Sequence, residues 1–552
     1  MKKLLGMLMA VGVLFAACST TAVDSGDSLL VSTKSGKVQG VEKENVRVWY
    51  GIPYGKEPVG SLRWQPPVSP DSWTEPLDCT TAPACAIQLS GTDIIGSDDS
   101  LRLTVYAPEN AASKNLPVLV YIHGGNNQTG TSEEIVGFDI VKNVDCIYVS
   151  VDYRLGLLGF NCLPSLVKEK GATGNFAMLD IASALDWVKD NIKNFGGNPK
   201  NVTISGFSAG GRDVMAMLIS PVFKDKFQKA VVFSGGMTTA DVELSVNKIA
   251  RAIAPLAVED GAAQDEESAY QWLLTDGDDV KDYLYSVSSA RLASLIGNAG
   301  IRMSVFPHLY EDDVVIPKGG FDNANYNNVP LMMVTGSTEF SFFCLFDGFF
   351  FSPAAQVLGE DSLNAAKSFA NKYGSDMYRI FNAQESARSM QDYKSPIYIC
   401  QVDFGSENSA SSNALLPFGA FHGIFVPMLA KQNGYVGLSN GAFEQEGYKA
   451  MSRAFCAYLS NFLRAGNPNA DELTEWPVWS NTELSLVLDA SETEAFVSAK
   501  NVTTTYEEIM DKMDSDDSVE SEAKTLVIEN VMNGRWFSSA LDKRYNTKNL
   551  WD

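Results

Sequence analysis

The sequence predicts an α/β fold with a mostly parallel central sheet that is covered by helices on both faces. Three observations predict it. Short apolar strands alternate with helical segments along most of the chain, a Gly-x-Ser-x-Gly turn joins one such strand to a helix, and 45% of the 552 residues are hydrophobic. Strands that alternate with helices become parallel, because each crossover helix returns the chain to the same edge of the sheet. This composition is sufficient for a large buried core.

The expected elements follow one another in a regular order. Apolar runs rich in β-branched residues predict buried strands, and apolar residues at helical spacing predict helices with one covered face. The helix-like stretch 240–300 is a candidate cap over an active site. We expect strands at 116–122, 146–151, 202–205, 230–233, 330–334 and 396–402, and helices at 177–192, 212–218 and 450–464.

The Gly-x-Ser-x-Gly motif occupies residues 206–210 and follows the strand expected at 202–205. It is typical of the nucleophile elbow of α/β-hydrolases, where a serine lies on a strained turn between a strand and a helix. Larger side chains beside such a turn would crowd it, so glycine is used. The pattern recurs at 437–441, but no buried strand precedes it, and we interpret Ser439 as a turn serine. Ser208 is the predicted nucleophile.

Several further segments are similar to one known family. They are residues 51–54 (Gly-Ile-Pro-Tyr), 58–60, 62–64, 97–108, 152–156, 196–199, 466–469 and 476–477. Together they resemble the type B carboxylesterases, which include cholinesterases and bacterial para-nitrobenzyl esterases, over about residues 29–497. The resemblance implies an α/β-hydrolase fold with helical cap insertions, and hydrolysis of carboxylic esters by a Ser-His-Glu triad.

Histidine is scarce in this chain, which narrows the search for a general base. Only His123, His308 and His422 are present, and histidine is the side chain whose pKa best suits proton transfer near neutral pH. His422 lies in a Gly-Ala-Phe-His-Gly segment that is similar to the catalytic loop of the family, and it follows Ser208 as in α/β-hydrolases. We predict that His422 is the base, that His123 is an orienting residue, and that His308 lies in a connecting loop.

The acid of the triad is sought among carboxylates that follow a buried strand. The resemblance places a glutamate there, and Glu339 stands at that place. Phe340 replaces the glycine that usually follows this glutamate, so Asp347 remains a second candidate, with Asp312 and Asp313 behind it. Such a carboxylate holds the imidazole in one tautomer and stabilises its charged form.

Backbone donors for an oxyanion are predicted in the loop after the strand expected at 116–122. Residues 123–126 read His-Gly-Gly-Asn and resemble the Gly-Gly-Gly loop of the family, with Asn126 in place of the third glycine. Donation comes from the backbone, and asparagine adopts positive φ more readily than most residues. We predict an oxyanion hole formed by the N–H groups of Gly125, Asn126 and Ala209, where removing one donor costs roughly 3–4 kcal/mol of barrier.

The leading interpretation is a serine hydrolase that cleaves small carboxylic esters through an acyl-enzyme. The phenylalanine-rich segment 340–351 either packs in the core or lines an acyl pocket, which would favour esters with a hydrophobic acyl or aromatic part. Two alternatives stay open: a non-catalytic binding or adhesion protein on the same fold, and an amidase, thioesterase or acyltransferase with the same triad. Because Ser208, His422 and a candidate acid are all present, the residues favour the enzyme.

Charge and cysteine content exclude some classes of function. The net charge of −24 argues against nucleic acid as a partner, since phosphates require a basic surface. No cysteine–histidine cluster has the spacing of a metal site, and the sequence implies no cofactor. Cys79 and Cys85 are the only closely spaced pair among eight cysteines, and they are candidates for a disulfide in an oxidising compartment.

The N-terminus has the features of an export signal. Two lysines precede an apolar run at 4–17 that is too short to span a bilayer. Residues 15–18 (Phe-Ala-Ala-Cys) resemble a bacterial lipobox, which implies cleavage and lipidation at Cys18; an ordinary secretory signal cut nearby is the alternative. We therefore expect an exported protein that is anchored to the bacterial cell envelope, periplasmic or surface-exposed, and that contacts the membrane only through its lipid.

The same reasoning divides the chain into four parts. We expect a lipoprotein signal peptide at 1–18, a small polar tether at 19–28, a catalytic domain at 29–499 and a C-terminal extension at 500–552 that is helical and docked on the body.

Overall fold

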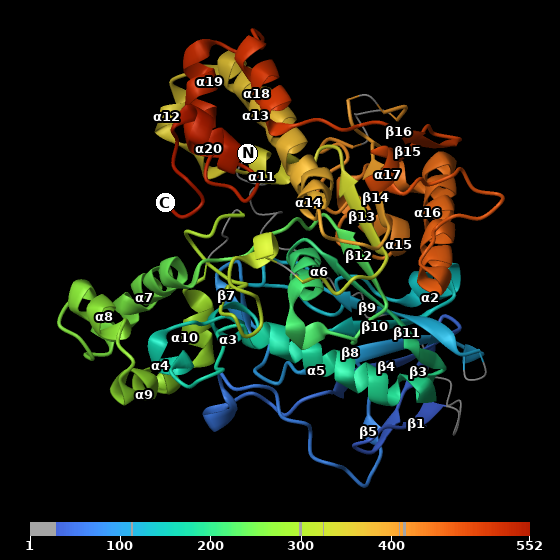
Figure 1. Cartoon of the computed structure of the whole chain (residues 1–552), viewed down its shortest axis with the longest axis vertical. Helices are drawn as coiled ribbons and strands as arrows, with labels where there is room; N and C mark the ends of the chain where they lie inside the picture. Colours follow the sequence, from blue (N-terminus) through green and yellow to red (C-terminus); the bar gives the residue numbers. More distant parts are fainter. Residues whose placement is uncertain (1–28, 112–113, 297–300, 324, 408, 412–415) are drawn as a thin grey trace. The chain divides into compact units, whose positions relative to one another are not determined.

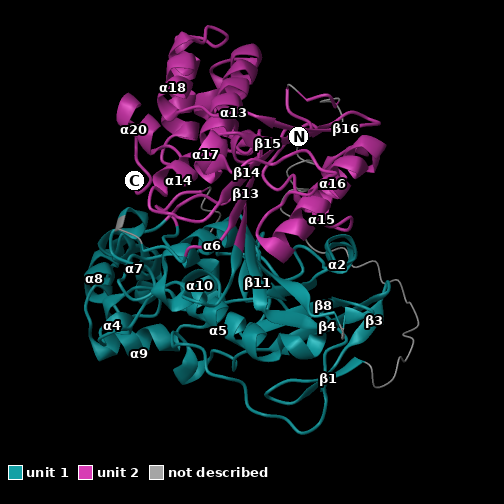
Figure 2. Cartoon of the chain, turned by 45° about the vertical axis from the view of Figure 1, so that its right-hand side comes forward, with its two compact units in different colours: residues 1–229, 239–297, 306–327 teal, residues 230–238, 298–305, 328–552 magenta. Residues whose placement is uncertain are grey.

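The computed structural model describes residues 29–111, 114–296, 301–323, 325–407, 409–411 and 416–552. The chain forms two compact units, which Figure 2 shows in different colours. Unit 1 comprises residues 1–229, 239–297 and 306–327, and unit 2 comprises residues 230–238, 298–305 and 328–552. The expected signal peptide, the tether and Cys18 lie outside the described residues and stay predictions.

In unit 1 the strands at one end of the sheet order are parallel, and those at the other end are antiparallel. In sheet order its strands are β3 (Val41–Lys43), β4 (Val46–Pro53), β8 (Arg102–Pro108), β10 (Ile147–Val151), β9 (Leu116–Ile122) and β11 (Gly197–Phe207). The last three run parallel to one another, and the pairings from β3 to β10 are antiparallel. Every residue of β9 and β10 is buried, as expected for strands covered on both faces.

Helices cover the strands of unit 1 and form one further cluster. α5 (Phe176–Asn191) and α6 (Ala209–Ile219) pack on β11, and α6 is buried along its whole length. The stretch expected to be helical from 240 to 300 contains α7 (Val242–Glu259), α8 (Glu266–Leu273), α9 (Asp278–Ser286) and α10 (Ser289–Ser294). These helices lie together in Figure 1. Their role as a cap stays a prediction.

Unit 2 contains a second, mainly parallel set of strands. Their order is β12 (Lys229–Phe233), of which residues 230–233 belong to this unit, β13 (Leu331–Gly336), β14 (Ile397–Val402), β15 (Ser485–Ala490) and β16 (Ala495–Lys500). Only the pairing of β15 with β16 is antiparallel. α16 (Glu446–Ala465) packs on β15 and β16.

The C-terminal residues of unit 2 are helical and pack on one long helix. α18 (Tyr506–Ser515) and α19 (Ser521–Val527) contact α13 (Glu360–Asn382), and α20 (Ser539–Tyr545) contacts α18. The smaller elements of the chain are β1 (Leu30–Ser32), β2 (Lys37–Gln39), β5 (Leu77–Asp78), β6 (Gln88–Ser90), β7 (Asp93–Ile95), α2 (Phe138–Val144), α3 (Gly156–Gly159), α4 (Pro164–Val167), α11 (Ser341–Leu345), α12 (Pro353–Gln356), α14 (Gln384–Ser389), α15 (Val426–Leu429) and α17 (Trp479–Thr482).

The expected strands and helices are present, with shifted ends. β11 starts at Gly197, five residues before the expected strand, and α6 starts at Ala209, directly after the turn serine. The candidate disulfide is wrong, because Cys79 and Cys85 are both free. The backbone around each cysteine is held by different partners: Cys79 donates to the Gln39 carbonyl, whereas the Cys85 carbonyl accepts from Ser97. Among the described residues, no helix has the length and apolarity needed to cross a membrane.

Candidate active site

The predicted nucleophile lies on a strained turn at the C-terminal end of β11. Ser208 has φ +55° and ψ −112°, which non-glycine residues rarely adopt, and α6 begins at the next residue. A Cβ added to Gly206 would lie 2.2 Å from the Gly210 carbonyl oxygen, and one added to Gly210 would lie 2.1 Å from the Ile122 carbonyl oxygen. These contacts explain both glycines of the motif, and the strain at Ser208 is the kind that functional turns store.

The loop after β9 runs beside this turn within unit 1. Ile122 pairs with Gly206 in the parallel register, so the residues that follow them continue side by side. Gly125 has φ +97° and Asn126 has φ +57°, and turn conformations of this kind direct successive N–H groups into one concavity. In the described part of the chain, the N–H groups of Gly125, Asn126 and Ala209 have no protein acceptor. They are therefore available to an anionic oxygen, and their assignment to an oxyanion hole stays a prediction.

His123 is buried at the start of this loop. Its Nδ1 lies 2.8 Å from the Gly124 carbonyl oxygen, and its ring stacks on Tyr153 with the centroids 4.5 Å apart. Burial lowers the pKa of His123 to about 4, because a charged imidazole is poorly solvated there. At neutral pH the ring is uncharged and donates from Nδ1 to Gly124, which agrees with an orienting residue.

Glu339 and His422 meet in unit 2. His422 Nδ1 lies 2.5 Å from Glu339 Oε2, and the two residues are 7% and 0% exposed. A carboxylate only accepts hydrogen bonds, so Nδ1 carries the proton and the neutral ring leaves Nε2 as its basic nitrogen. This is the tautomer that a general base in a triad requires.

The other oxygen of Glu339 is held by three donors. Glu339 Oε1 accepts from Ser234 Oγ at 2.6 Å, from Thr335 Oγ1 at 3.1 Å and from the Gly336 N–H at 2.6 Å. These hydrogen bonds compensate the cost of burying the carboxylate and fix its orientation. No motif in the sequence singles out these residues. The available signal was their position, since Ser234 follows β12, and Thr335 and Gly336 end the neighbouring strand β13.

Aromatic rings fix the plane of the His422 side chain. The Tyr378 ring stacks on the imidazole with the centroids 5.5 Å apart, and the Phe343 ring meets it edge-on at 5.3 Å. Tyr378 comes from α13 and Phe343 from α11. The base is therefore held by a hydrogen bond at Nδ1 and by packing on its ring.

The competing acid candidates have other partners. Asp347 Oδ2 lies 2.5 Å from Arg535 Nη2, and Asp347 Oδ1 accepts from the Phe349 N–H at 2.9 Å. Asp312 in unit 1 accepts from Asn175 Nδ2 and from the N–H groups of residues 314 and 315. Asp347 thus forms an ion pair with the C-terminal segment, and Asp312 stabilises a turn.

The remaining histidine and the second motif serine have local partners as well. His308 is fully buried, and its Nε2 lies 2.7 Å from Arg212 Nη1. Ser439 donates to the Val436 carbonyl at 2.9 Å in a turn, as expected for a turn serine. In the described ranges, no group of three or more histidine, cysteine, aspartate or glutamate side chains is arranged to hold a metal ion.

The phenylalanine-rich segment contributes to both packing and surface. Phe340 is fully buried against Phe537, with the ring centroids 5.2 Å apart, whereas Phe351 is 52% exposed. Phe342 and Phe346 are half-buried and contact Phe418. The segment therefore contains rings in the core, rings that are half-buried and one that is exposed.

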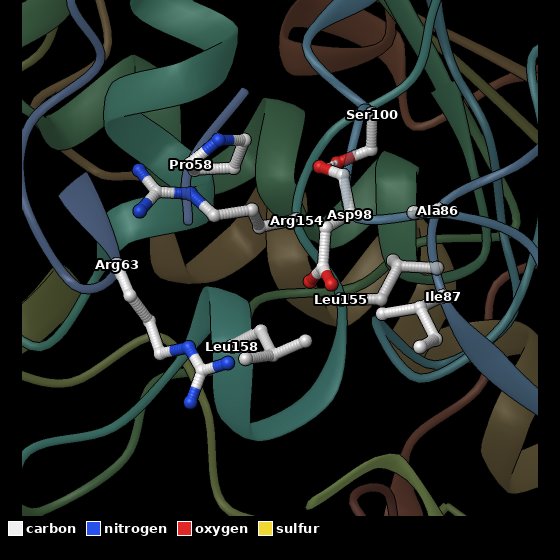
Figure 3. Close-up of a pocket in the computed structure, with 9 residues that line it drawn as sticks. All are labelled: Pro58, Arg63, Ala86, Ile87, Asp98, Ser100, Arg154, Leu155 and Leu158. Atoms are coloured by element: carbon white, nitrogen blue, oxygen red, sulfur yellow. Dashed lines mark hydrogen bonds between the residues drawn. The ribbon is translucent and has the colours of Figure 1, made fainter. Parts of the chain in front are cut away.

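A pocket in unit 1 is separate from these residues. It is lined by Pro58, Arg63, Ala86, Ile87, Asp98, Ser100, Arg154, Leu155 and Leu158 (Figure 3). Arg154 is bound by Asp180 through two hydrogen bonds of 2.8 and 2.6 Å, and Arg63 donates to the Val287 carbonyl at 2.6 Å. None of the predicted catalytic residues lines this pocket, and both of its cations are already bound by the protein.

Asp213, in the first turns of α6, provides a test of buried charge. Burial raises its pKa to about 7, while Asn127 and Arg212 act in the opposite direction. Between pH 4 and pH 7 the folded protein therefore holds a proton on Asp213 that the unfolded chain has released. Binding this proton stabilises the folded state at low pH, and the stabilisation is lost as the pH rises to 7. Asp213→Asn removes the titration, so the variant should gain stability relative to the wild type over this range, by up to about 4 kcal/mol.

The measurement is the difference in unfolding midpoint between the two proteins, in denaturant, from pH 4 to pH 8. Parallel pH dependences would contradict a proton held on Asp213.

Comparisons with known proteins find relatives over most of the chain. The model of the carboxylesterase family matches residues 27–349 and 354–509. The chain is 29% identical over 495 residues to the para-nitrobenzyl esterase of Bacillus subtilis (strain 168), over 84% of this chain and 95% of that protein. It is also 29% identical over 536 residues to carboxylesterase 1D of Rattus norvegicus, over 86% of this chain and 92% of that protein.

The solved structure of a PNB esterase matches with a TM-score of 0.62 and 26% identity, over 85% of this chain and 97% of that chain. The predicted fold is therefore confirmed as that of the α/β-hydrolases, with a large, mostly parallel sheet surrounded by helices. With the family model matching most of its length, the chain belongs to the carboxylesterase family and is a carboxylic ester hydrolase of the serine type.

Proposed function

We propose that this carboxylesterase uses Ser208 as nucleophile, His422 as general base and Glu339 as the residue that orients the imidazole. The observation that carries the proposal is the buried hydrogen bond of 2.5 Å between His422 Nδ1 and Glu339 Oε2. The strained turn that holds Ser208, directly before the N-terminus of α6, supports the same assignment.

In the proposed reaction Ser208 Oγ attacks the ester carbonyl while His422 Nε2 takes the hydroxyl proton. The negative charge that develops on the carbonyl oxygen is stabilised by the N–H groups of Gly125, Asn126 and Ala209 and by the positive end of the α6 dipole. His422 then protonates the leaving alcohol. A water molecule, deprotonated by the same imidazole, attacks the acyl-enzyme and releases the acid.

The proposed substrates are small esters with a hydrophobic acyl or aromatic part. The support is local: the Phe343 ring contacts His422, and Phe342 and Phe346 are half-buried in the adjoining segment. Apolar contact with these rings would lower the free energy of binding in proportion to the apolar area that is removed from water.

We also propose that the enzyme is exported and held at the cell envelope by a lipid on Cys18. The support is the apolar run at 4–17 and the lipobox-like residues 15–18. Partition of the full-length protein into a detergent phase, lost in Cys18→Ser, is the expected result; equal partition of both proteins would contradict the anchor.

Nitrophenyl esters of increasing acyl length, together with a fluorophosphonate probe, test the proposed chemistry. We expect covalent labelling, turnover of the esters, and a kcat/KM that rises from acetyl to longer or aromatic acyl groups. Labelling with faster turnover of a matched thioester or anilide would favour a thioesterase or an amidase. A properly folded protein that neither reacts with the probe nor turns over any ester would favour the binding protein.

A further inference from the structure

A buried arginine of α6 binds the loop that carries the predicted oxyanion donors. Arg212 is 1% exposed, and its Nη2 donates to Asn126 Oδ1 at 3.0 Å. Arg212 follows Ala209 by three residues, about 4.5 Å along the helix axis. The same helical turn therefore supplies one predicted donor, the Ala209 N–H, and holds the residue that supplies another.

The guanidinium of Arg212 is itself fixed by His308. Its Nη1 donates to His308 Nε2 at 2.7 Å, and His308 Nδ1 lies 3.1 Å from the Phe306 carbonyl oxygen. Burial and the charge of Arg212 hold the pKa of His308 well below its ordinary value. The imidazole is therefore neutral, with its proton on Nδ1 toward Phe306, and Nε2 is free to accept from Arg212. This network leaves the guanidinium a single orientation, directed at Asn126.

A second hydrogen bond joins the next residue of the loop to the next residue of the helix. Asn127 Nδ2 donates to Asp213 Oδ1 at 2.9 Å, and Tyr153 donates from its hydroxyl to Asn127 Oδ1 at 3.0 Å. Two consecutive loop residues are thus bound to two consecutive residues of α6. Such a pair of contacts restrains the loop against both rotation and translation relative to the N-terminus of the helix.

The side chain at position 126 has a conformational cost that these contacts offset. Asn126 has φ +57°, a region that costs most residues other than glycine on the order of 1–2 kcal/mol, and asparagine less than most. Glycine would remove this strain and keep the backbone N–H, but it would have no side chain for Arg212 to hold. Asparagine at this position therefore accepts some backbone strain, and its side chain restrains the loop through Arg212.

We propose that Arg212 is a positioning residue for ester hydrolysis, which acts through Asn126 to hold the oxyanion-loop N–H groups against the N-terminus of α6. The inference rests on the proposed function for its catalytic part, while the restraint of the loop can be measured without any turnover. Arg212 Nη2 donates to Asn126 and Nη1 to His308, so the guanidinium acts on the reacting atoms through the loop.

The kinetic test compares Arg212→Met, Asn126→Gly and the double variant on nitrophenyl butyrate. Each concentration is corrected by active-site titration, so that misfolded molecules do not count. We expect each single variant to lower kcat about 10- to 100-fold, somewhat less than the loss of a whole donor, with KM within about 2-fold. The kcat of the double variant should equal that of the less active single variant within about 2-fold, because both changes break the same interaction. Arg212→Lys should recover part of the loss.

A trifluoromethyl ketone distinguishes positioning from a general structural effect. Its adduct with the serine carries an oxyanion in the place of the reaction intermediate, so its inhibition constant should rise by the same factor as kcat falls. Arg47→Met is the matched control, since Arg47 is a buried arginine of the same unit that donates to the Pro108 carbonyl. It should change kcat less than about 2-fold. Unchanged kcat and unchanged inhibition in Arg212→Met, or additive losses in the double variant, would overturn the proposal.

Hydrogen exchange tests the restraint by itself. The N–H groups of Gln128 and Thr129 both donate to the Gly125 carbonyl at 3.0 Å and close the loop. They should exchange at least about 10-fold faster in Arg212→Met than in the wild type, and at an unchanged rate in Arg47→Met. A wild type that neither reacts with the fluorophosphonate nor turns over esters would refute the proposed function. Equal exchange rates in Arg212→Met and the wild type would instead refute the restraint of the loop.

Discussion

Replacing Ser208 by alanine should lower kcat for nitrophenyl esters by about 10⁴-fold or more and abolish covalent labelling by a fluorophosphonate. The reason is that the Ser208 Oγ forms the ester bond of the acyl-enzyme, and no other group on the turn can replace it. Ser208 belongs to a buried strand–turn–helix segment, and alanine keeps the backbone donors of that segment. The folded state should therefore persist, and labelling of the intact protein, followed by mass spectrometry, is the measurement.

Ser439→Ala is the matched control for this prediction, because Ser439 lies in the other Gly-x-Ser-x-Gly segment of the chain. Its hydroxyl donates to the Val436 carbonyl, so the variant should lose a little stability and keep kcat within about 2-fold. If Ser208→Ala kept its labelling while Ser439→Ala lost it, the nucleophile would be Ser439 and the assignment of Ser208 would be wrong.

Replacing Glu339 by glutamine should lower kcat by about 10³- to 10⁴-fold with a small change in KM. Glutamine has one accepting oxygen, whereas the carboxylate accepts on both. If that oxygen faces Ser234 and Gly336, the amide nitrogen faces His422 Nδ1, and the imidazole must take the tautomer with its proton on Nε2. If the amide turns round, the donors that hold Oε1 lose their acceptor. Single-turnover acylation in the two proteins measures the loss.

Asp347→Asn separates this effect from a general disturbance of the acidic segment. Asp347 pairs with Arg535, which is 2% exposed, and removing one partner of a buried ion pair costs about 3–5 kcal/mol of stability. The variant should therefore unfold at a lower temperature but retain its kcat per titrated site. A loss of kcat in Asp347→Asn equal to that in Glu339→Gln would argue against Glu339 as the orienting carboxylate.

Local patterns in the sequence were sufficient for much of the fold. The buried strand at 116–122 is a run of apolar residues and the one at 397–402 is apolar except for Gln401, and such segments have few stable alternatives to a central strand. The nucleophile elbow was also predicted from its motif. Within that motif, Gly206 is required because an added Cβ would meet the Gly210 carbonyl, whereas Gly210 is required by the Ile122 carbonyl of β9. The ends of elements were harder to predict from the sequence, because Gly197 and Ala209 acquire their structure from pairing and packing with distant residues.

The choice of acid shows where such patterns stop. Glu339 and Asp347 both follow the same buried strand, and each is flanked by phenylalanine. Which carboxylate meets the imidazole depends on how the segment 416–425, which carries His422, packs against the end of β13. Asp347 instead meets Arg535, which is 188 residues away in the chain. Interactions over such separations carry no local signal.

The sequence alone predicted Ser208 as nucleophile and His422 as base, in that order along the chain, because a nucleophile and a base need particular side chains in short, recognisable segments. The tertiary structure alone decided that Glu339 is the carboxylate bound to His422 and that Ser234 donates a hydrogen bond to Glu339. It also decided that Arg212 donates a hydrogen bond to Asn126. Each of these is a hydrogen bond between residues far apart in the chain, and its existence depends on distances and directions that only the packed strands and helices establish.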